Sequence, residues 1–479
     1  MQQQQPRFTL IRNATVLSID PDIGNQTDCD ILMKDDRIQA LAPNLTVPNN
    51  APAATIIDGT DCIVTPGFVD GHHHVWQHLL RGVATNWTLL DYCIEMRTLY
   101  GSLFTPDDVH LAQYVGALSL LNNGVTCVLD HCHVVNSPAH ADAAVNGLKE
   151  TGIRGTFCYG LYENPVLPGQ GQAAAVFDLD MRKNDALRVR QELFPVRDPE
   201  KALLTFGFAP REPEGQGIDD TVADLQVART LGARITTMHV AMGHYDTRHA
   251  RVVHNLADAD LLAPDLVFSH GASFTDGELA AIARVGAGIV GTPDTELQMG
   301  MGYPVVFKAR DAGCRVGLGL DITSNQCNDF VAQMRLAVQT QRAIENAGFV
   351  SSPPVALKRT TADVLRMGTM GGAEVMHLEN LVGSITPGKK ADLVLFRCDD
   401  IDTVPVLDPV GTVVFHTSPG KIDTVVVDGR IVKKDGKLVG VDWPSLRRQV
   451  EARSRRIVAE AARIDTSMQR EQWSRAFAV

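Results

Sequence analysis

The chain has 479 residues, of which 44% are hydrophobic and 21% charged, as is ordinary for a globular protein with a large buried core. Its formal net charge of −12 gives an acidic surface that repels phosphate backbones, so we expect no nucleic-acid partner. No apolar stretch approaches the roughly 18 residues of a membrane-spanning helix, so we expect no membrane partner. The nine cysteines are scattered without a CxxC pair, which favours buried free thiols and a reducing, cytoplasmic setting.

Both ends of the chain have the pattern of β-strands. Alternating apolar residues predict a strand over Phe8–Ile19, and Asp30–Leu41 has the pattern of a hairpin. Near the other end, Ala391–Phe396 is an apolar strand run, and Ile422–Leu438 has strands separated by Asp-Gly turns. We therefore expect one small β-sandwich domain that is built from both ends of the chain.

The middle of the chain alternates short apolar runs with helical patterns such as Thr105–Asn122, Asp219–Leu231 and Thr275–Val285. A glycine-rich loop is predicted over Leu167–Ala174. The alternation is typical of a parallel sheet, and eight repeats over about 250 residues predict a closed, TIM-like (β/α)8 barrel. The eight predicted strands are Cys62–Asp70, Val125–Asp130, Ile153–Tyr159, Leu203–Ala209, Arg234–His239, Leu266–His270, Gly286–Thr292 and Val316–Asp321.

The tail, Ser445–Arg470, is rich in arginine and has heptad-like apolar spacing. This pattern predicts a helix that packs on the body or on another subunit. The expected α/β organisation has a β-sandwich from residues 1–66 and 386–444, a barrel from residues 67–385, and a helical tail from residues 445–479.

Four of the eight predicted strands end in a residue that can bind a metal or transfer a proton. In such barrels, catalytic groups collect at the C-terminal ends of the strands. The first strand ends in a His-x-His pair, and strand alternation places His72 and His74 on the same side. The fifth, sixth and eighth strands end in His239, His270 and Asp321. A lone residue of this kind is commonly structural, but their joint occurrence at these ends indicates a metal-dependent active site.

Two segments resemble the amidohydrolase superfamily. The run Thr65–Gln77 (TPGFVDGHHHVWQ) resembles its opening signature, and Gly383–Leu395 (GSITPGKKADLVL) resembles the return into its small β-sandwich. Leu129–Pro138 and Gly317–Asn325 are most similar to the branch of cytosine, guanine and adenosine-derivative deaminases and triazine hydrolases. The resemblance covers nearly the whole chain. It implies a metal-dependent hydrolase that acts, as a deaminase does, on a non-peptide carbon–nitrogen bond of a small cyclic molecule.

The resemblance implies one divalent ion that is held by four side chains, namely His72, His74, His239 and Asp321. Zinc suits this mixed nitrogen and oxygen set, with iron or manganese as alternatives. Binuclear relatives carry a carbamylated lysine at the end of the fourth strand, which here is Phe206–Glu212 without a lysine, so we expect one ion. Asp321 would accept the proton of a metal-activated water, and His270 would donate a hydrogen bond to the hydroxide or to the charge that develops on the substrate.

One position departs from the family pattern. In the deaminase branch, a proton-shuttling glutamate usually follows the fifth-strand histidine by three residues, and here that position is Met242, which cannot transfer a proton. His244 and Asp246 are the nearest substitutes in the sequence. The departure keeps an alternative open, a non-hydrolytic metal-dependent lyase, dehydratase or decarboxylase on the same scaffold. A third hypothesis, a metal-free interaction scaffold, conflicts with the intact ligand set.

Several residues near the predicted strand ends are candidates for contact with a small-molecule substrate. Gln77 occupies the place where relatives bind a substrate amide or ring. Trp76 is a candidate stacking surface, with core packing as the alternative. His131 and His133 follow the second strand, where one of them would face the pocket.

Three further candidates lie after later strands. Arg211 ends the fourth strand beside Glu212, and would contact a polar substrate or pair with that neighbour. His244 is a functional candidate or a simple loop histidine. Glu296 follows the seventh strand, and would bind a cationic or amino-bearing substrate or cap a helix. Because relatives commonly associate, we expect a homo-oligomer.

Overall fold

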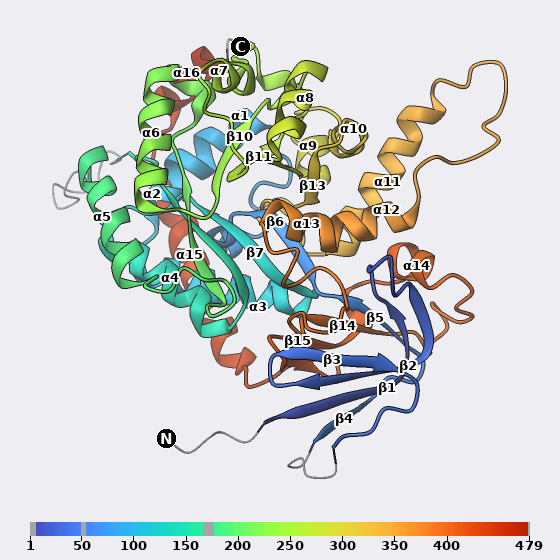
Figure 1. Ribbon diagram of the computed structural model, residues 1–479. Helices are drawn as coiled ribbons and strands as arrows, with labels where there is room; N and C mark the ends of the chain where they lie inside the picture. Colours follow the sequence, from blue (N-terminus) through green and yellow to red (C-terminus); the bar gives the residue numbers. More distant parts are fainter. Residues whose placement is uncertain (1–5, 49–53, 166–176, 478–479) are drawn as a thin grey trace. The chain divides into compact units, whose positions relative to one another are not determined.

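The computed structural model describes residues 6–48, 54–165 and 177–477. The chain divides into two compact units, each assembled from segments that lie far apart in the sequence (Figure 1). The first unit consists of Met1–Asp70, Ser119–Cys127 and Asp329–Val441, and the second of Gly71–Leu118, Val128–Asn328 and Asp442–Val479. The predicted loop at Leu167–Ala174 lies outside the described residues.

A mixed sheet in the first unit combines strands from both ends of the chain. Its strands are β1 (Phe8–Leu17), β2 (Asn25–Lys34), β3 (Arg37–Ala42), β4 (Thr55–Asp58), β5 (Cys62–Pro66), β14 (Leu393–Arg397), β15 (Ile422–Val427), β16 (Arg430–Lys434) and β17 (Lys437–Leu438). Their order is β17-β16-β15-β14-β5-β1-β2-β3, with β4 paired to β1. The predicted sheet from both termini is therefore confirmed.

Alternation of apolar residues along these strands buries one face of the sheet in a hydrophobic cluster. Ile11 and Val16 of β1, Ile31 of β2 and Leu393 of β14 are buried in this cluster. The same unit contains α11 (Phe330–Asn346), α12 (Thr361–Arg366), η5 (Met367–Gly371), α13 (Gly372–Val375), α14 (Pro409–Gly411), η6 (Thr412–His416) and η7 (Pro419–Lys421).

Eight strands form a closed parallel barrel, which confirms the predicted TIM-like fold. They are β6 (Phe68–His73), β7 (Val125–Cys132), β8 (Arg154–Gly160), β9 (Leu204–Ala209), β10 (Thr236–Val240), β11 (Leu266–His270), β12 (Gly288–Gly291) and β13 (Arg315–Leu318). The ring order is β10-β11-β12-β13-β6-β7-β8-β9. Most of these strands are buried along their whole length, as expected for strands that are covered on both faces.

The first predicted barrel strand is wrong in its extent. Instead of one strand over Cys62–Asp70, the structure has β5 in the mixed sheet and β6 in the barrel, separated at Gly67. A side chain there would place its Cβ 2.0 Å from Oγ1 of Thr126, so glycine is required where the chain passes from sheet to barrel. Continuous apolar character hid this break because both strands are buried.

Helices and helical turns of the second unit follow and flank the barrel strands (Figure 1). They are η1 (Val75–Leu80), α1 (Leu89–Asp91), the π-helix η2 (Tyr92–Tyr100), α2 (Gly101–Leu103), α3 (Pro106–Asn122), α4 (Pro138–Thr151), α5 (Leu179–Glu192), η3 (Pro213–Gly215), α6 (Ile218–Leu231), η4 (Gly243–Tyr245), α7 (Val252–Asp258), α8 (Asp276–Val285), α9 (Pro293–Gln298) and α10 (Val306–Asp311). The three predicted helices correspond to α3, α6 and α8. Among the described helices, none has the length and apolar character needed to span a membrane.

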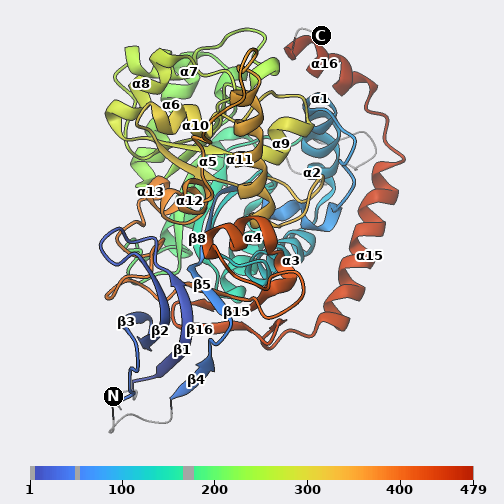
Figure 2. The same cartoon turned by 90° about the vertical axis from the view of Figure 1, so that its right-hand side faces the viewer.

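The predicted tail helix is two helices, α15 (Trp443–Ala461) and α16 (Ser467–Phe477). They pack on the second unit, α15 against η1 and α2, and α16 against α1 and η2 (Figure 2). Arg453 and Arg456 of α15 both bind the buried carboxylate of Asp108. The tail thus packs on the body of the chain, one of the two arrangements that its sequence predicted.

Candidate metal centre and active site

Strand ends of the barrel bring histidine and aspartate side chains together. His72 lies on β6, His239 on β10, and His270 ends β11. Asp321 follows β13, and its carbonyl oxygen accepts a hydrogen bond from the His74 amide at 2.7 Å. The backbones of His270 and Asp321 have φ values of 75° and 62°, in the left-handed region that non-glycine residues rarely adopt. Such strain is typical of positions where the fold holds a functional side chain in place.

Four of these side chains present one atom each to a common point. Nε2 of His74 lies 3.2 Å from Nε2 of His239, and Oδ1 of Asp321 lies 3.4 Å from Nε2 of both His72 and His74. Ligands about 2.0–2.1 Å from one tetrahedral zinc ion are ~3.3 Å apart. These three separations match those between ligands of one divalent ion, and the ligand atoms of His72, His74 and His239 all lie within 4.8 Å of one another.

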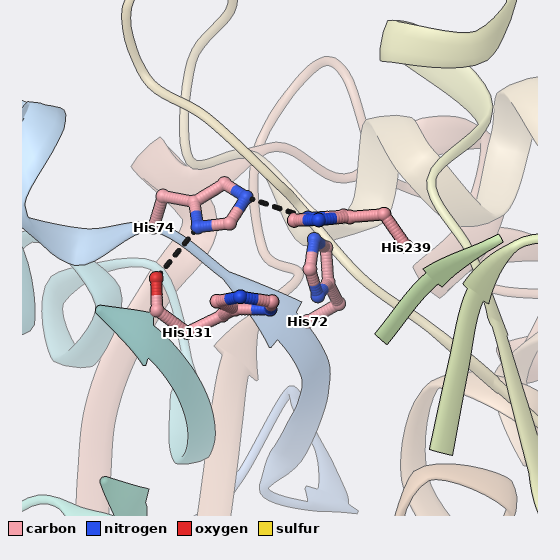
Figure 3. Close-up of side chains that lie close together, drawn as sticks. All are labelled: His72, His74, His131 and His239. Atoms are coloured by element: carbon pink, nitrogen blue, oxygen red, sulfur yellow. Dashed lines mark hydrogen bonds between the residues drawn. The ribbon is translucent and has the colours of Figure 1, made fainter. Parts of the chain in front are cut away.

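The other ring nitrogen of each histidine is held by an oxygen atom, and this determines which nitrogen faces the common point. Nδ1 of His74 donates to the carbonyl oxygen of His131 at 2.7 Å (Figure 3). Nδ1 of His239 lies 3.1 Å from the Glu212 carboxylate, and Nδ1 of His72 lies 2.8 Å from Oγ of Ser269. With the proton on Nδ1, each Nε2 lone pair is available for a metal.

The surroundings of the candidate ligands hold them in the protonation states that metal binding requires. Burial lowers the pKa of His72 to about 3 and that of His74 well below its ordinary value. Burial also acts to raise the pKa of Asp321, but its hydrogen bond with His72 and the nearby histidine charges leave that pKa far below its usual range. The site therefore presents neutral imidazoles and an ionised carboxylate.

His270 lies beside the cluster and is held from behind by α9. Its Nδ1 is 3.1 Å from Oγ1 of Thr292 and 3.5 Å from Oε1 of Glu296, which is fully buried. Burial lowers the pKa of His270, but the hydrogen bond to Glu296 and the charges of Asp321 and Glu296 outweigh it, so the pKa is raised. His270 is thus set to carry a proton on Nε2 while Nδ1–H remains bound to its supports.

A second group of charges lies on the opposite side of His239. Arg97 of η2 donates from Nη1 to Oε1 of Glu212 at 2.9 Å, and its guanidinium lies 4.4 Å from the centre of the Tyr162 ring. Burial acts to raise the pKa of Glu212, but His239 and Arg97 together lower it to about 2. Glu212 therefore remains an anion that connects a candidate metal ligand with a buried cation.

A small cavity adjoins the candidate metal centre. Its lining residues are Leu89, Tyr92, Cys93, Arg97, His239, His270, Thr295, Met299, Met301, Asp321 and Ile322. Its volume of about 40 Å³ holds a few water molecules. A ring substrate therefore fits only after side chains of the wall move. Met299 and Met301 are suited to such movement because methionine side chains adapt their conformation easily, and Leu89 is a further apolar side chain of this wall.

The predicted substrate residues of the first two strands lie behind this cavity. Gln77 is fully buried and bound on both sides of its amide, to Tyr92 Oη at 2.6 Å and Ser324 Oγ at 2.7 Å. Trp76 is also fully buried and packs edge-on against Phe104. Neither residue lines the cavity. Gln77 influences the cavity wall through its hydrogen bond to Tyr92, which it holds in position.

His131 and His133 pack against the histidines of the cluster. His131 stacks on His239 with ring centres 4.4 Å apart, and its Nε2 lies 2.8 Å from Tyr162 Oη. His133 stacks on His74 at 4.1 Å. Burial lowers the pKa of both residues well below the ordinary value, so both rings are neutral supports of the cluster.

The remaining candidates lie away from the cavity or behind His270. Arg211 is turned toward α6, where it binds Asp224 at 2.9 Å. His244 is an exposed residue of η4. Glu296 accepts a hydrogen bond from the Thr292 amide at 2.8 Å and supports His270 rather than lining the cavity. The structure thus brings together the predicted ligands and His270 but separates them from Arg211 and His244.

Sequence reasoning missed the side of the cavity that η2 provides. Tyr92 and Arg97 are separated from every predicted strand end, and no local pattern marks them as site residues. Sequence reasoning also missed Glu214, whose carboxylate accepts a hydrogen bond from the amide of Ala241, two residues after His239. Burial and the nearby charge of Asp246 raise the pKa of Glu214 to about 8. This acid is held next to the segment in which Met242 replaces the usual glutamate.

Comparisons with known proteins agree with this architecture. The model of the amidohydrolase family matches residues 63–432. A 5-methylthioadenosine/S-adenosylhomocysteine deaminase of Desulforudis audaxviator is 26% identical over 455 residues, which cover 94% of this chain and 99% of that protein. An isoxanthopterin deaminase from an unknown prokaryotic organism is 28% identical over 460 residues, which cover 89% and 90%.

Solved structures share the fold. A zinc-bound adenosine deaminase from Xanthomonas campestris superposes with a TM-score of 0.82 at 22% sequence identity, covering 94% of this chain and 98% of that one. A triazine hydrolase variant has a TM-score of 0.80 at 21% identity, covering 93% and 99%.

Proposed function

Because the chain belongs to the amidohydrolase family, we propose that it is a hydrolytic deaminase, which replaces an amino group on a small heterocyclic ring by oxygen and releases ammonia. The chain is a hydrolase that acts on carbon–nitrogen bonds other than peptide bonds. The observation that carries the finer proposal is the convergence of imidazole Nε2 atoms with a carboxylate oxygen. Nε2 of His74 lies 3.2 Å from Nε2 of His239, and Oδ1 of Asp321 lies 3.4 Å from Nε2 of both His72 and His74.

His72, His74, His239 and Asp321 would hold the metal. Zinc suits three imidazoles and a carboxylate, and one ion suits a fourth-strand end without lysine. When bound, a divalent ion supplies Lewis acidity that lowers the pKa of a coordinated water toward about 7. Relatives with adenosine-derivative and pterin substrates support a ring amine as the substrate.

Two residues would move the protons of the reaction. Asp321 accepts a proton from the attacking water through its carboxylate, and His270 donates a hydrogen bond from Nε2 to the charge that develops on the ring. The carbon–oxygen bond forms first and makes the ring carbon tetrahedral; the proton taken from water then goes to the amine, and the carbon–nitrogen bond breaks to release ammonia. Because Met242 carries no proton, Asp321 and His270 must deliver it, and Glu214 is a further carboxyl group held beside the segment that contains Met242.

The lyase alternative arose from Met242 alone. The relatives described above are deaminases, which remove ammonia with water, so they favour hydrolysis over elimination. The structure supplies a reason why methionine is tolerated, since Glu214 places another carboxyl group beside the same segment.

An ammonia-release assay over ring amines tests the proposal. We expect the zinc-loaded protein to release ammonia from at least one member of a panel of 5-methylthioadenosine, adenosine, guanine, cytosine and isoxanthopterin. Asp321→Asn should abolish release and weaken zinc binding, because it removes both the proton acceptor and a ligand. Full activity of Asp321→Asn would contradict the assigned role. Absence of ammonia from the whole panel, with zinc bound, would contradict the proposed reaction.

A further inference from the structure

The side of the cavity that η2 provides carries a buried cation whose binding capacity is only partly used. We propose that Arg97 is a specificity-determining residue that binds a planar acceptor group of the substrate, either a ring carbonyl oxygen together with a nearby unprotonated ring nitrogen, as in O6 and N7 of a 6-oxopurine, or a carboxylate. This inference rests on the proposed function, because it assigns the substrate class of the same site.

The hydrogen bonds of Arg97 leave one edge of the guanidinium free. A guanidinium offers five N–H donors. The described residues provide one acceptor, Glu212, which binds Nη1. Nε is buried and has no hydrogen-bond partner in the described part of the chain. The side chain is only 12% exposed, so bulk water does not readily replace the missing acceptor. A buried unsatisfied donor of this kind is costly, and a ligand acceptor would relieve the cost.

The position of Arg97 is fixed relative to the candidate metal. Glu212 binds Nη1 of Arg97 and Nδ1 of His239 with the same carboxylate, at 2.9 and 3.1 Å. The Tyr162 ring supports the guanidinium from one face at 4.4 Å. Arg97 is therefore held through two short contacts to a residue whose Nε2 faces the metal position.

The rest of the cavity wall cannot supply the same recognition. Leu89, Met299, Met301 and Ile322 are apolar and suit the faces of a planar ring. The Tyr92 hydroxyl oxygen accepts a hydrogen bond from Gln77, so Tyr92 can offer a ligand only a single neutral donor. A substrate with its amine at the metal thus meets one permanent cation among the lining residues, and its acceptor atoms would have to lie at Arg97.

The chemistry of that edge defines the substrate class. Nε–H and one Nη–H point in parallel and match two acceptors on one planar group, as in the O6 and N7 edge of a 6-oxopurine or in a carboxylate. Lysine cannot reproduce this arrangement because its ammonium is a single point charge. Ring amines without such acceptors, such as unsubstituted aminopurines, would leave the donors unpaired and be selected against.

Binding measurements on the zinc-loaded protein test this without turnover. The probes are hypoxanthine, which has the O6 and N7 edge, benzoate, which has the carboxylate, and purine, which has neither a carbonyl nor a carboxylate. We expect hypoxanthine or benzoate to bind the wild type more tightly than purine, and Arg97→Lys to weaken that probe roughly 10- to 150-fold, as expected for a lost charged hydrogen bond. Tighter binding of hypoxanthine identifies a ring carbonyl as the group, and tighter binding of benzoate a carboxylate.

Arg188→Lys is the matched control, because Arg188 binds Asp142 and Asp185 on α4 and α5, away from the cavity. Zinc content should equal that of the wild type in both variants, which separates recognition from damage to the metal site. Equal affinities of all three probes in wild type, or affinities unchanged by Arg97→Lys, would overturn the inference.

Turnover then gives an independent comparison. If ammonia is released, the ratio of kcat/KM for guanine over 2-aminopurine should fall in Arg97→Lys, and this ratio cancels any general loss of activity. Failure to release ammonia contradicts the proposed deamination, whereas unaltered probe binding contradicts the role of Arg97, so the two failures are distinguishable.

Discussion

At the scale of single residues, the candidate site is defined by what holds each imidazole. Each Nδ1 has an oxygen partner that holds its proton there: a backbone carbonyl for His74, a carboxylate for His239 and a hydroxyl for His72. These partners orient the three lone pairs toward one point and are as much a part of the site as the ligands. His270 has the same kind of support from Glu296; it lines the cavity, and one of its ring nitrogens lies within 4.8 Å of ligand atoms of His72 and Asp321.

Glu296→Gln should lower kcat about 10- to 100-fold, a common effect of losing a partner of an active-site histidine, and leave the zinc content unchanged. Loss of the Glu296 charge lowers the pKa of His270, so the alkaline limb of the kcat profile should move to lower pH. Steady-state kinetics across pH measure both effects.

Asp294→Asn is the control for that variant, since it makes the same change on the same helix, where Asp294 binds Gln298. An unshifted pH profile in Glu296→Gln with normal kcat would mean that Glu296 only caps α9.

Some of these residues could be predicted from the sequence and others could not. The meeting of His72, His74, His239 and Asp321 was predictable because barrel topology brings strand ends together, whereas their assignment as ligands came from the family resemblance. Arg97 and Tyr92 were not, because their approach to the cavity depends on how η2 packs, which no local pattern encodes. Glu296 was singled out for its charge, but its burial behind His270 depends on the turn at Thr292 and could not be foreseen.

At the scale of elements, the π-helix η2 is the part of the site with the least support from the barrel strands. A π-helix within a helical segment is frequent at functional sites. It is held instead by the C-terminal tail. Trp473 of α16 donates from Nε1 to Thr98 Oγ1 at 3.1 Å, and Arg470 binds Asp91 at 3.0 Å. We infer that α16 stabilises the cavity wall that carries Arg97.

Trp473→Ala should therefore raise KM by about tenfold if roughly 1.4 kcal/mol of wall stabilisation is lost, and it should lower kcat by a smaller factor. Zinc content should stay constant, because no ligand touches α16. Met468→Ala provides a control on the same helix, since Met468 is 58% exposed. Identical KM values in both variants would show that the tail does not support the wall.

A second prediction at this scale concerns η3, which carries Glu214. Burial raises the pKa of Glu214 from 4.5 to about 8. Between these values the folded protein retains a proton that the unfolded chain has released. The free energy of unfolding therefore falls as pH rises from about 4.5 to about 8 and levels off above that range. Glu214→Gln removes this loss. The free energy of unfolding of Glu214→Gln minus that of the wild type should therefore be larger at pH 9 than at pH 5.

Urea unfolding at the two pH values measures this difference. Glu200→Gln is a control with the same change at an exposed position. A pH dependence in Glu214→Gln equal to that of the wild type would contradict the raised pKa.

At the scale of the whole molecule, fold class was the most predictable property. Alternation of strand and helix fixes a parallel barrel, and strands at both ends of the chain must pair with each other because neither set forms a complete sheet alone. The division at Gly67 was less accessible, because β5 and β6 are equally buried and only the close approach of Thr126 separates them. The predicted ligand set thus depended on topology, whereas the predicted substrate contacts depended on packing.

The central claim is that one divalent metal ion, held by His72, His74, His239 and Asp321, makes this chain a hydrolytic deaminase. Titration of metal-free protein with zinc, while ammonia release from a ring amine is recorded, tests it most directly. We expect no release without metal and a rise in rate that saturates at one zinc per chain. Ammonia release that is independent of metal, saturation at two equivalents, or no release at any zinc concentration would contradict it.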